Sequence, residues 1–285
     1  MMSVYMFPGQ GSQKVGMGSE VFAEFPAYVE EANGILGCSV EELCIQGPQG
    51  RLSQTQYTQP ALFVVCALMY LQKVQTSPKP DYVLGHSVGE YAALFSAGCF
   101  DFATGLQLVK KRGELMSQAQ GGGMAAIISL SPEKISQLLL ENHLDGVDIA
   151  NYNSPTQIVI SGIKVDIESA VRVLENEARM CIPLNVSGAF HSRYMLHARD
   201  EFAEFISQFQ FSNTTIPVVS NVTARLYDQS NIANNLISQI NSSVRWVESI
   251  EFLLNQGQSD FLEIGPGTVL TSLVRQIRQA QESRV

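Results

Sequence analysis

The stretch Gly85-His86-Ser87-Val88-Gly89 joins two segments of different hydrophobic periodicity. Before it, residues 81–84 form a short apolar run after a proline, which predicts a buried strand. After it, apolar residues recur at the spacing of an amphipathic helix: Val88, Tyr91, Ala92 and Phe95. A serine at such a strand-to-helix corner exposes its hydroxyl, and the flanking glycines permit the tight turn. The pattern therefore favours a nucleophilic Ser87 over a plain Gly/Ser turn.

Composition and charge favour a globular protein and disfavour a nucleic-acid binder, a membrane-spanning protein and a secreted protein. The chain has 285 residues, 45% hydrophobic and 16% charged, which is enough to bury a large core in one big or two smaller domains. Its formal net charge of -9 argues against a general nucleic-acid binder, which needs a basic face. The longest apolar run, 61–71, is too short to span a membrane, and the N-terminus lacks the pattern of a secretory signal.

The cysteines are scattered and odd in number, and no Cys-x-x-Cys pair occurs. They are Cys38, Cys44, Cys66, Cys99 and Cys181. We therefore expect buried free thiols and a cytoplasmic protein, because the cytoplasm keeps thiols reduced.

A second glycine-containing loop follows the first predicted strand, residues 3–7. It reads Pro8-Gly9-Gln10-Gly11-Ser12-Gln13. Its spacing fails the dinucleotide fingerprint and no Gly-Lys-Ser/Thr follows, so nucleotide binding is disfavoured. The loop can instead offer a backbone N–H to an oxyanion hole, beside the N–H that follows the nucleophile.

The next segment, residues 17–75, is predicted to be mainly helical. Within it, a polar loop at 53–60 leads into a very apolar helix that starts at Ala61 and belongs in a large core. Gln59 can be a site residue or a helix cap, and the sequence favours the cap.

The helix predicted at 103–117 carries a cation on its apolar face. On a helical wheel, Arg112 lies among Leu108, Val109, Leu115 and Met116. A guanidinium there is costly unless it meets an anion or several acceptors. Arg112 can pair with an internal carboxylate or reach the rim, or it can offer a planar fork to a substrate carboxylate. Both interpretations stay open on the residues alone.

The pattern of elements changes after Gly121-Gly122-Gly123. It predicts strand 124–130, helix 131–142, strands 147–150 and 157–160, helix 166–177 and strand 180–186. The order β-α-β-β-α-β is the ferredoxin-like unit. We therefore predict an α/β fold: an α/β-hydrolase-like large domain with a parallel sheet, over 1–122 and 190–285, and an inserted ferredoxin-like small domain over 123–189. The triple glycine is a hinge or a plain flexible turn.

Four histidines can serve as general base for Ser87. The side chain of His86 should diverge from its neighbour at the turn, His143 ends a small-domain helix, and His197 lies in a solvated helical turn. His191 follows a strand at the domain junction, where a cleft opens. We therefore predict a Ser87–His191 pair. No acid suited to orient the imidazole stands between them, and a backbone carbonyl can take that role.

With these residues in place, the sequence resembles the malonyl-CoA:acyl-carrier-protein transacylase family, and within it the free-standing, trans-acting acyltransferases of polyketide synthases. The match runs nearly end to end. It is carried by Phe7-Pro8-Gly9-Gln10-Gly11-Ser12-Gln13, Thr58-Gln59-Pro60-Ala61-Leu62, Gly85-His86-Ser87-Val88-Gly89-Glu90-Tyr91, Arg112-Gly113, Met124-Ala125-Ala126, Asn153-Ser154-Pro155 and Gly188-Ala189-Phe190-His191.

The resemblance implies ping-pong acyl transfer in polyketide or fatty acid biosynthesis. Ser87 would attack malonyl-CoA, and His191 would then deprotonate the phosphopantetheine thiol of an acyl carrier protein, which takes the malonyl group. The main-chain carbonyl of Gln239 would orient His191. Malonyl-CoA is a substrate, so the resemblance implies no cofactor and no metal. The expected partner is the carrier protein, with no nucleic acid and no membrane, and we expect a monomer.

The resemblance also implies the groups that surround the acyl chain. The backbone N–H groups of Gln10 and Val88 would form the oxyanion hole, and Arg112 would clamp the malonyl carboxylate. Val88 and the run 189–191 resemble malonyl-selective members. Gly188 departs from the His-Ala-Phe-His version of many modular synthase domains, so malonyl selectivity is an expectation.

Two other functions stay open. An acyl hydrolase of the same fold would clear acyl groups from carrier proteins, although uncharged acyl groups would give Arg112 nothing to pair with. A catalytically silent docking domain is the third hypothesis, which the intact Ser87, His191 and Arg112 disfavour. The candidate basic patches for carrier docking are Lys110 with Lys111 and Arg275 with Arg278.

Overall fold

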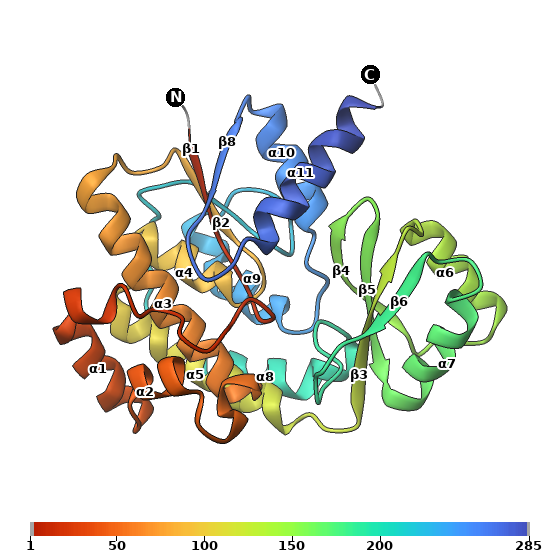
Figure 1. The fold of residues 1–285 in the computed structure, drawn as a ribbon, viewed down its shortest axis with the longest axis horizontal. Coiled ribbons are helices and arrows are strands. Elements are labelled where there is room, and N and C mark those ends of the chain that lie inside the picture. The colour runs from red at the N-terminus through yellow and green to blue at the C-terminus, as the bar shows by residue number, and fades with distance from the viewer. Residues whose placement is uncertain (1–2, 284–285) are drawn as a thin grey trace.

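Two separate sheets organise the molecule (Figure 1). The structure is a computed structural model that describes residues 3–283. One four-stranded sheet has the order β7-β2-β1-β8 and is parallel, and the other has the order β4-β5-β3-β6 and is antiparallel. The fold is therefore α/β with one parallel and one antiparallel sheet, as predicted.

The parallel sheet is built from distant parts of the chain. Its strands are β1 (Ser3–Phe7), β2 (Tyr82–Gly85), β7 (Val218–Val219) and β8 (Asp260–Glu263). The register pairs Phe7 with Gly85, so the loop after β1 and the turn after β2 leave the sheet side by side. This register places the two glycine-containing segments of the sequence at one edge of the sheet.

Helices cover both faces of this sheet. They are α1 (Pro26–Leu36), α2 (Val40–Gln46), α3 (Thr55–Thr76), α4 (Gly89–Ser96), α5 (Phe102–Gln118), α8 (Leu196–Ile206), α9 (Ile232–Gln239), α10 (Trp246–Asn255) and α11 (Val269–Glu282), with short 3-10 turns η1 (Phe22–Glu24), η2 (Pro48–Ser53), η3 (Arg193–Met195) and η4 (Gln229–Asn231). Successive residues of β1 point to opposite faces. Tyr5 and Phe7 join the core built on α3, α4 and α5, whereas Val4 and Met6 join the core built on α10 and α11.

Helix α3 begins earlier than the sequence predicts. The segment 53–60 was expected to be a polar loop, but the helix starts at Thr55. Its polar side chains are satisfied internally: the Thr58 hydroxyl donates to Leu52 O at 2.7 Å, and the Gln59 amide donates to Thr55 Oγ1 at 2.9 Å. The prediction that Gln59 caps a helix is wrong, because Gln59 is buried within α3.

The antiparallel sheet follows the predicted β-α-β-β-α-β order. Its elements are β3 (Gly122–Ile128), α6 (Pro132–Glu141), β4 (Asp148–Ser154), β5 (Gln157–Ile163), α7 (Lys164–Leu174) and β6 (Met180–Pro183). Helices α6 and α7 bury one face, packing against Ala125, Ile127, Ile158 and Ile160. Strand β4 continues past the predicted end at Ala150, since it pairs with β5 as far as Ser154.

Most of the triple glycine lies in a strand rather than in a turn. Gly122 and Gly123 lie in β3 and pair with β5, and only Gly121 precedes the strand. A Cβ on Gly122 would lie 2.1 Å from Ala189 N, so this glycine allows β3 to touch the segment that leads to His191.

The molecule has two parts, the parallel sheet with its helices and the antiparallel sheet with α6 and α7. They are joined along β4. The Val244 N–H donates to Ala150 O at 2.8 Å, and Val244 O accepts from the Tyr152 N–H at 3.0 Å. Within residues 3–283, no helix is both long and apolar enough to cross a membrane. All five cysteines lie in the described part of the chain and are free thiols, three of them buried.

Candidate active site

Ser87 occupies the predicted corner between β2 and α4. Its backbone has a φ of +52°, in the left-handed region that non-glycine residues adopt only where the surroundings enforce it. A Cβ on Gly85 would lie 2.0 Å from the Gly89 carbonyl carbon, and a Cβ on Gly89 would lie 2.1 Å from Phe7 O. Both glycines are required because the turn folds directly onto the neighbouring strand.

His191 is in contact with Ser87. The Ser87 Oγ to His191 Nε2 distance is 2.7 Å, and His191 Nδ1 lies 2.9 Å from Gln239 O and 3.2 Å from Ser242 O. Carbonyl oxygens only accept, so Nδ1 carries the proton and Nε2 is free to accept from the Ser87 hydroxyl. Backbone carbonyls thus occupy the place of the missing acid.

The imidazole is held neutral. Burial, and next the charge of Arg112, lower the pKa of His191 to about 3. A neutral imidazole is the form that can take a proton from a hydroxyl or a thiol.

The other three histidines are placed as predicted. His86 Nε2 lies 2.8 Å from Asn153 Oδ1, so its ring turns away from Ser87. His143 is exposed, and His197 is exposed and pairs with Glu201.

Arg112 is buried in α5 and points at the nucleophile. Its side chain is 1% exposed. Nη1 donates to Gln59 Oε1 at 2.5 Å, and Nη2 donates to Ser87 Oγ at 3.1 Å and to Gln239 Oε1 at 2.9 Å. Among the described residues, no carboxylate lies within salt-bridge distance of Arg112. Within 3–283, the internal carboxylate that acts on Arg112 is therefore Glu90, by charge attraction and through Gln239 rather than in a direct ion pair.

Gln239 connects the three central residues. Its carbonyl accepts from His191, its Oε1 accepts from Arg112, and its Nε2 donates to Ser87 O at 3.0 Å. The resemblance implied only the carbonyl contact. The side-chain contacts were not predicted, because Ser87 and Gln239 are 152 positions apart.

Glu90 is a buried acid that the sequence analysis did not single out. It is 0% exposed, and it accepts from the Asn221 N–H and the Tyr227 hydroxyl, each at 2.8 Å, and from Gln239 Nε2. Burial raises the pKa of Glu90 to about 7, against the effect of its hydrogen bonds and of Arg112. Its only sequence signal is one acidic residue in the first turn of an otherwise apolar helix.

Asn221 fixes the corner from the other side. Its Oδ1 accepts from the Ser87 N–H at 2.7 Å, and its Nδ2 donates to Gly85 O at 2.6 Å. Since Glu90 binds both Asn221 and Gln239, one carboxyl group supports the nucleophile, the base and the arginine.

A small cavity of about 90 Å³ lies in front of Ser87, between the two sheets. Its polar lining is Gln10, Gln59, His86, Ser87, Arg112, Asn151 and His191, and its apolar lining is Val88, Met116, Met124, Leu184, Val186 and Phe190. Gln10 is held by the Thr55 hydroxyl, which donates to its Oε1 at 2.7 Å. In the described hydrogen-bond network, neither the Gln10 nor the Val88 N–H has a protein acceptor. The cavity suits a small acyl group with an anionic end.

Within 3–283, no group of three or more His, Cys, Asp or Glu side chains is placed to hold a metal ion.

The acyl transferase domain family matches residues 4–285, essentially the whole chain. This chain belongs to that family. The acyl transferase is 53% identical to a polyketide biosynthesis malonyl CoA-acyl carrier protein transacylase, PksC of Bacillus subtilis, with 99% of each chain covered. It is 44% identical to a malonyl CoA-acyl carrier protein transacylase of Synechocystis, covering 96% of this chain and 93% of the relative.

Solved structures share the fold of the acyl transferase. A malonyl CoA-acyl carrier protein transacylase from Burkholderia pseudomallei superposes with a TM-score of 0.95 at 46% identity, covering 98% of each chain. A malonyl-transacylase solved in complex with a type II PKS acyl-carrier protein superposes with a TM-score of 0.93 at 36% identity, covering 98% of this chain and 94% of that one.

The structure brings together every site residue that the sequence and the resemblance named. Ser87 and Gln239 each bond to both His191 and Arg112, and Gln10 and Val88 line the same cavity. The members that the sequence did not single out are Glu90 and Asn221, and Gln59, for which the sequence favoured a helix cap, also belongs to the site.

Proposed function

We propose that this acyl transferase moves a malonyl group from malonyl-CoA to the phosphopantetheine thiol of an acyl carrier protein, in polyketide or fatty acid biosynthesis. The observation that carries the proposal is the buried Arg112 cation. It faces the nucleophile at 3.1 Å, and its hydrogen-bond partners within the described residues are neutral. A malonyl carboxylate is the anion that this position lacks, and the malonyl transacylases named above support the assignment.

The guanidinium is preorganised for a carboxylate. Gln59 and Gln239 hold Nη1 and Nη2 through their amide oxygens, which fixes the plane of the fork. A bound carboxylate takes the bond that Nη2 now gives to Ser87 Oγ, and it forms charge-assisted hydrogen bonds. The same movement frees the serine oxygen for attack.

In the first half-reaction, His191 Nε2 accepts the Ser87 hydroxyl proton while Oγ attacks the thioester carbonyl carbon. The carbonyl oxygen gains negative charge, which the free N–H groups of Gln10 and Val88 stabilise. The carbon–sulfur bond then breaks. The proton moves from His191 to the CoA thiolate, and malonyl-Ser87 forms.

The second half-reaction reverses the roles. The carrier thiol gives its proton to His191 and its sulfur attacks the ester carbonyl. The bond to Ser87 Oγ breaks, and the serine regains the proton from His191. The thioester and the thiol supply all the bonding changes, so the reaction as proposed needs no cofactor.

The fold that accompanies this function is an α/β-hydrolase-like large domain over 1–122 and 190–285 with a ferredoxin-like small domain over 123–189. The serine corner after a parallel strand supports the first part. The antiparallel order β4-β5-β3-β6 with both helices on one face supports the second. A cytoplasmic location fits the free thiols, and the protein acts as a monomer.

The test uses labelled malonyl-CoA and acetyl-CoA, with and without a holo carrier protein. We expect malonyl label on Ser87, and transfer of that label to the carrier faster than release to water. Rapid release to water from acetyl or longer acyl carriers would instead identify the acyl hydrolase and contradict the proposal. Absence of label with both donors would identify a silent docking domain.

A further inference from the structure

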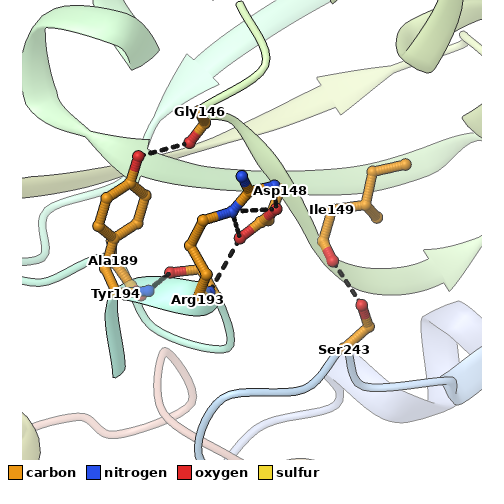
Figure 2. Close-up of polar contacts among 8 residues, drawn as sticks. Gly146, Asp148, Ile149, Ala189, Arg193, Tyr194 and Ser243 are labelled. Carbon is orange, nitrogen blue, oxygen red and sulfur yellow. Dashed lines mark hydrogen bonds and ion pairs between the residues drawn. The ribbon is translucent and has the colours of Figure 1, made fainter. Parts of the chain in front are cut away.

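An ion pair links the two parts of the molecule beside the base. Asp148 is the first residue of β4, and Arg193 opens the turn η3, two positions after His191. The Asp148 carboxylate accepts from the Arg193 N–H at 2.9 Å and from its Nε at 3.0 Å to each oxygen, and it also accepts from Nη2. Figure 2 shows this carboxylate holding both the main chain and the side chain of Arg193.

Two further bonds join β4 and the residues just before it to the same region. The Tyr194 hydroxyl donates to Gly146 O at 3.0 Å, and the Ser243 hydroxyl donates to Ile149 O at 2.5 Å (Figure 2). The edge of β4 is thus bonded to two segments that contact the base: the turn after His191 and the segment that follows Gln239.

His191 needs such support because its backbone is strained. Its φ is +57°, a conformation that a non-glycine residue keeps only where its surroundings over-determine it. Ser192 secures the near side: its hydroxyl donates to Ala189 O at 2.5 Å and accepts from the Tyr194 N–H at 3.3 Å. The outer side of this loop borders a groove of about 760 Å³ lined by His191, Ser192 and Arg193, whereas Phe190 and Met195 pack into the core on its inner side.

The carbonyls that orient the imidazole depend on the same strand. His191 Nδ1 faces Ser242 O at 3.2 Å, and the next residue, Ser243, is the one bonded to Ile149 O. Strand β4 therefore bonds both to the loop that carries His191 and to the residue next to Ser242, whose carbonyl is one of the two acceptors of His191 Nδ1.

We propose that Asp148 and Arg193 are a positioning pair that holds the His191 loop against β4 and so sets the distance from His191 Nε2 to Ser87 Oγ. This inference rests on the proposed function, in which His191 is the base. Exposed ion pairs are usually weak, but this one is a fork-to-carboxylate contact with an added main-chain bond. The Asp148 side chain is 22% exposed and the Arg193 side chain 57%, so the main-chain bond and the fork geometry rather than burial give the contact its strength.

The pair predicts a specific kinetic pattern. Because His191 acts in both half-reactions, breaking the pair slows acylation from malonyl-CoA and transfer to the carrier by the same factor. The KM for malonyl-CoA stays unchanged, since Arg112, which holds the malonyl carboxylate in the proposed function, does not belong to this loop. Malonyl and acetyl donors are affected equally, unlike in a variant of Arg112.

The experiment compares Arg193→Met, Asp148→Asn and the double variant, with both half-reactions measured separately. We expect each single variant to lose about tenfold in each step, because small displacements of a catalytic group are costly. The double variant loses no more than the worse single variant, as two residues of one unit do. Arg193→Lys, which keeps the charge but not the fork, falls between Arg193→Met and the wild type.

The matched control is Arg199→Met. Arg199 pairs with Asp200 on α8, with its Nε 2.9 Å from Asp200 Oδ1, and this pair does not connect the two sheets. The control should stay within about twofold of the wild type, since surface substitutions usually have small effects. Thermal melting of each variant separates loss of position from loss of fold, and Asp148→Asn preserves the side-chain volume.

Three results would overturn the inference: normal rates in both steps for Arg193→Met and Asp148→Asn, a loss confined to the carrier step, or additive losses in the double variant. His191→Ala distinguishes this failure from failure of the proposed function. If His191→Ala still forms malonyl-Ser87 at the normal rate, the base role itself is wrong. If His191→Ala is inactive while Arg193→Met is normal, only the positioning role is wrong.

Discussion

Arg112 is a buried cation whose hydrogen-bond partners are two amide oxygens and the nucleophile. Truncation to alanine removes the carboxylate fork but leaves Ser87 and His191 in place. We expect Arg112→Ala to lose malonyl loading by about 100-fold, since charge-assisted bonds are strong, and to lose acetyl loading far less. Initial rates of label incorporation on Ser87 from the two donors measure this. Lys111→Ala on the same helix is the control, and equal losses for both donors would make Arg112 structural.

Glu90 gives the protein a pH-dependent stability of known sign. Its folded-state pKa is raised to about 7 from an ordinary 4.5. The stability it contributes is therefore fully present below pH 4.5 and is lost as the pH rises to about 7, where the folded state must accept a buried charge. His191 works in the opposite direction, since its pKa is lowered. Only a comparison of variants isolates the Glu90 effect.

The comparison is the free energy of unfolding of the wild type and of Glu90→Gln, measured by denaturant titration from pH 4.5 to 8. Relative to the variant, the wild type should lose about 3 kcal/mol between pH 4.5 and 7 and then level off. The exposed Glu168→Gln gives the baseline. A difference between wild type and Glu90→Gln that does not change with pH would mean that Glu90 is ionised throughout.

Elements with a clear internal period were predicted from the sequence. Strand β2 and helix α4 flank the serine corner because their apolar spacing changes from a continuous run to a helical stripe at Gly85. Ser131 and Pro132 mark the start of α6, where the Ser131 hydroxyl caps the Lys134 N–H. Such signals are local, so the sequence alone contains them.

Elements whose polarity is satisfied by distant partners were mispredicted. The first turn of α3 was predicted as a polar loop because its residues are polar. In the structure they bond to each other and, through Gln59, to Arg112 in α5. The sequence predicted that strand β4 ends at Ala150. In the structure the strand continues, and Asn153 lies within it and binds His86. Polar side chains normally indicate solvent, and only the assembled fold shows that these residues face a buried site.

The arrangement of the two parts explains why the site could be predicted only in pieces. The nucleophile and the base could be chosen from the residues, Arg112 could be singled out but its role stayed open, and the structure places Ser87 in contact with both. Gln239 was reached through the resemblance alone, and Glu90 and Asn221 were missed, because the contacts that define those two residues span 131 to 149 positions. Long-range contacts of this kind leave no periodic signal.

The two basic patches named from the sequence as candidates for carrier docking differ in how their side chains are engaged. Lys110 donates to Ile35 O and Lys111 lies over the Phe205 ring, so both are engaged on α5. Arg275 is exposed on α11, beside Gln276, whose Oε1 accepts from the Ser154 hydroxyl at 2.7 Å across the boundary between the two parts. Of these patches, only α11 therefore presents a cation where the two parts meet.

We expect Arg275→Glu to raise the KM for an acidic holo carrier several-fold, roughly the effect of a rim charge on association, and to make that KM less sensitive to salt. Loading of Ser87 from malonyl-CoA should stay within about twofold, since the acyl cavity is untouched. Both half-reactions are measured at two salt concentrations, with Lys111→Glu as a charge-matched control. A larger effect of Lys111→Glu on the carrier KM would place docking on α5, and equal effects would mean that net charge rather than position governs encounter.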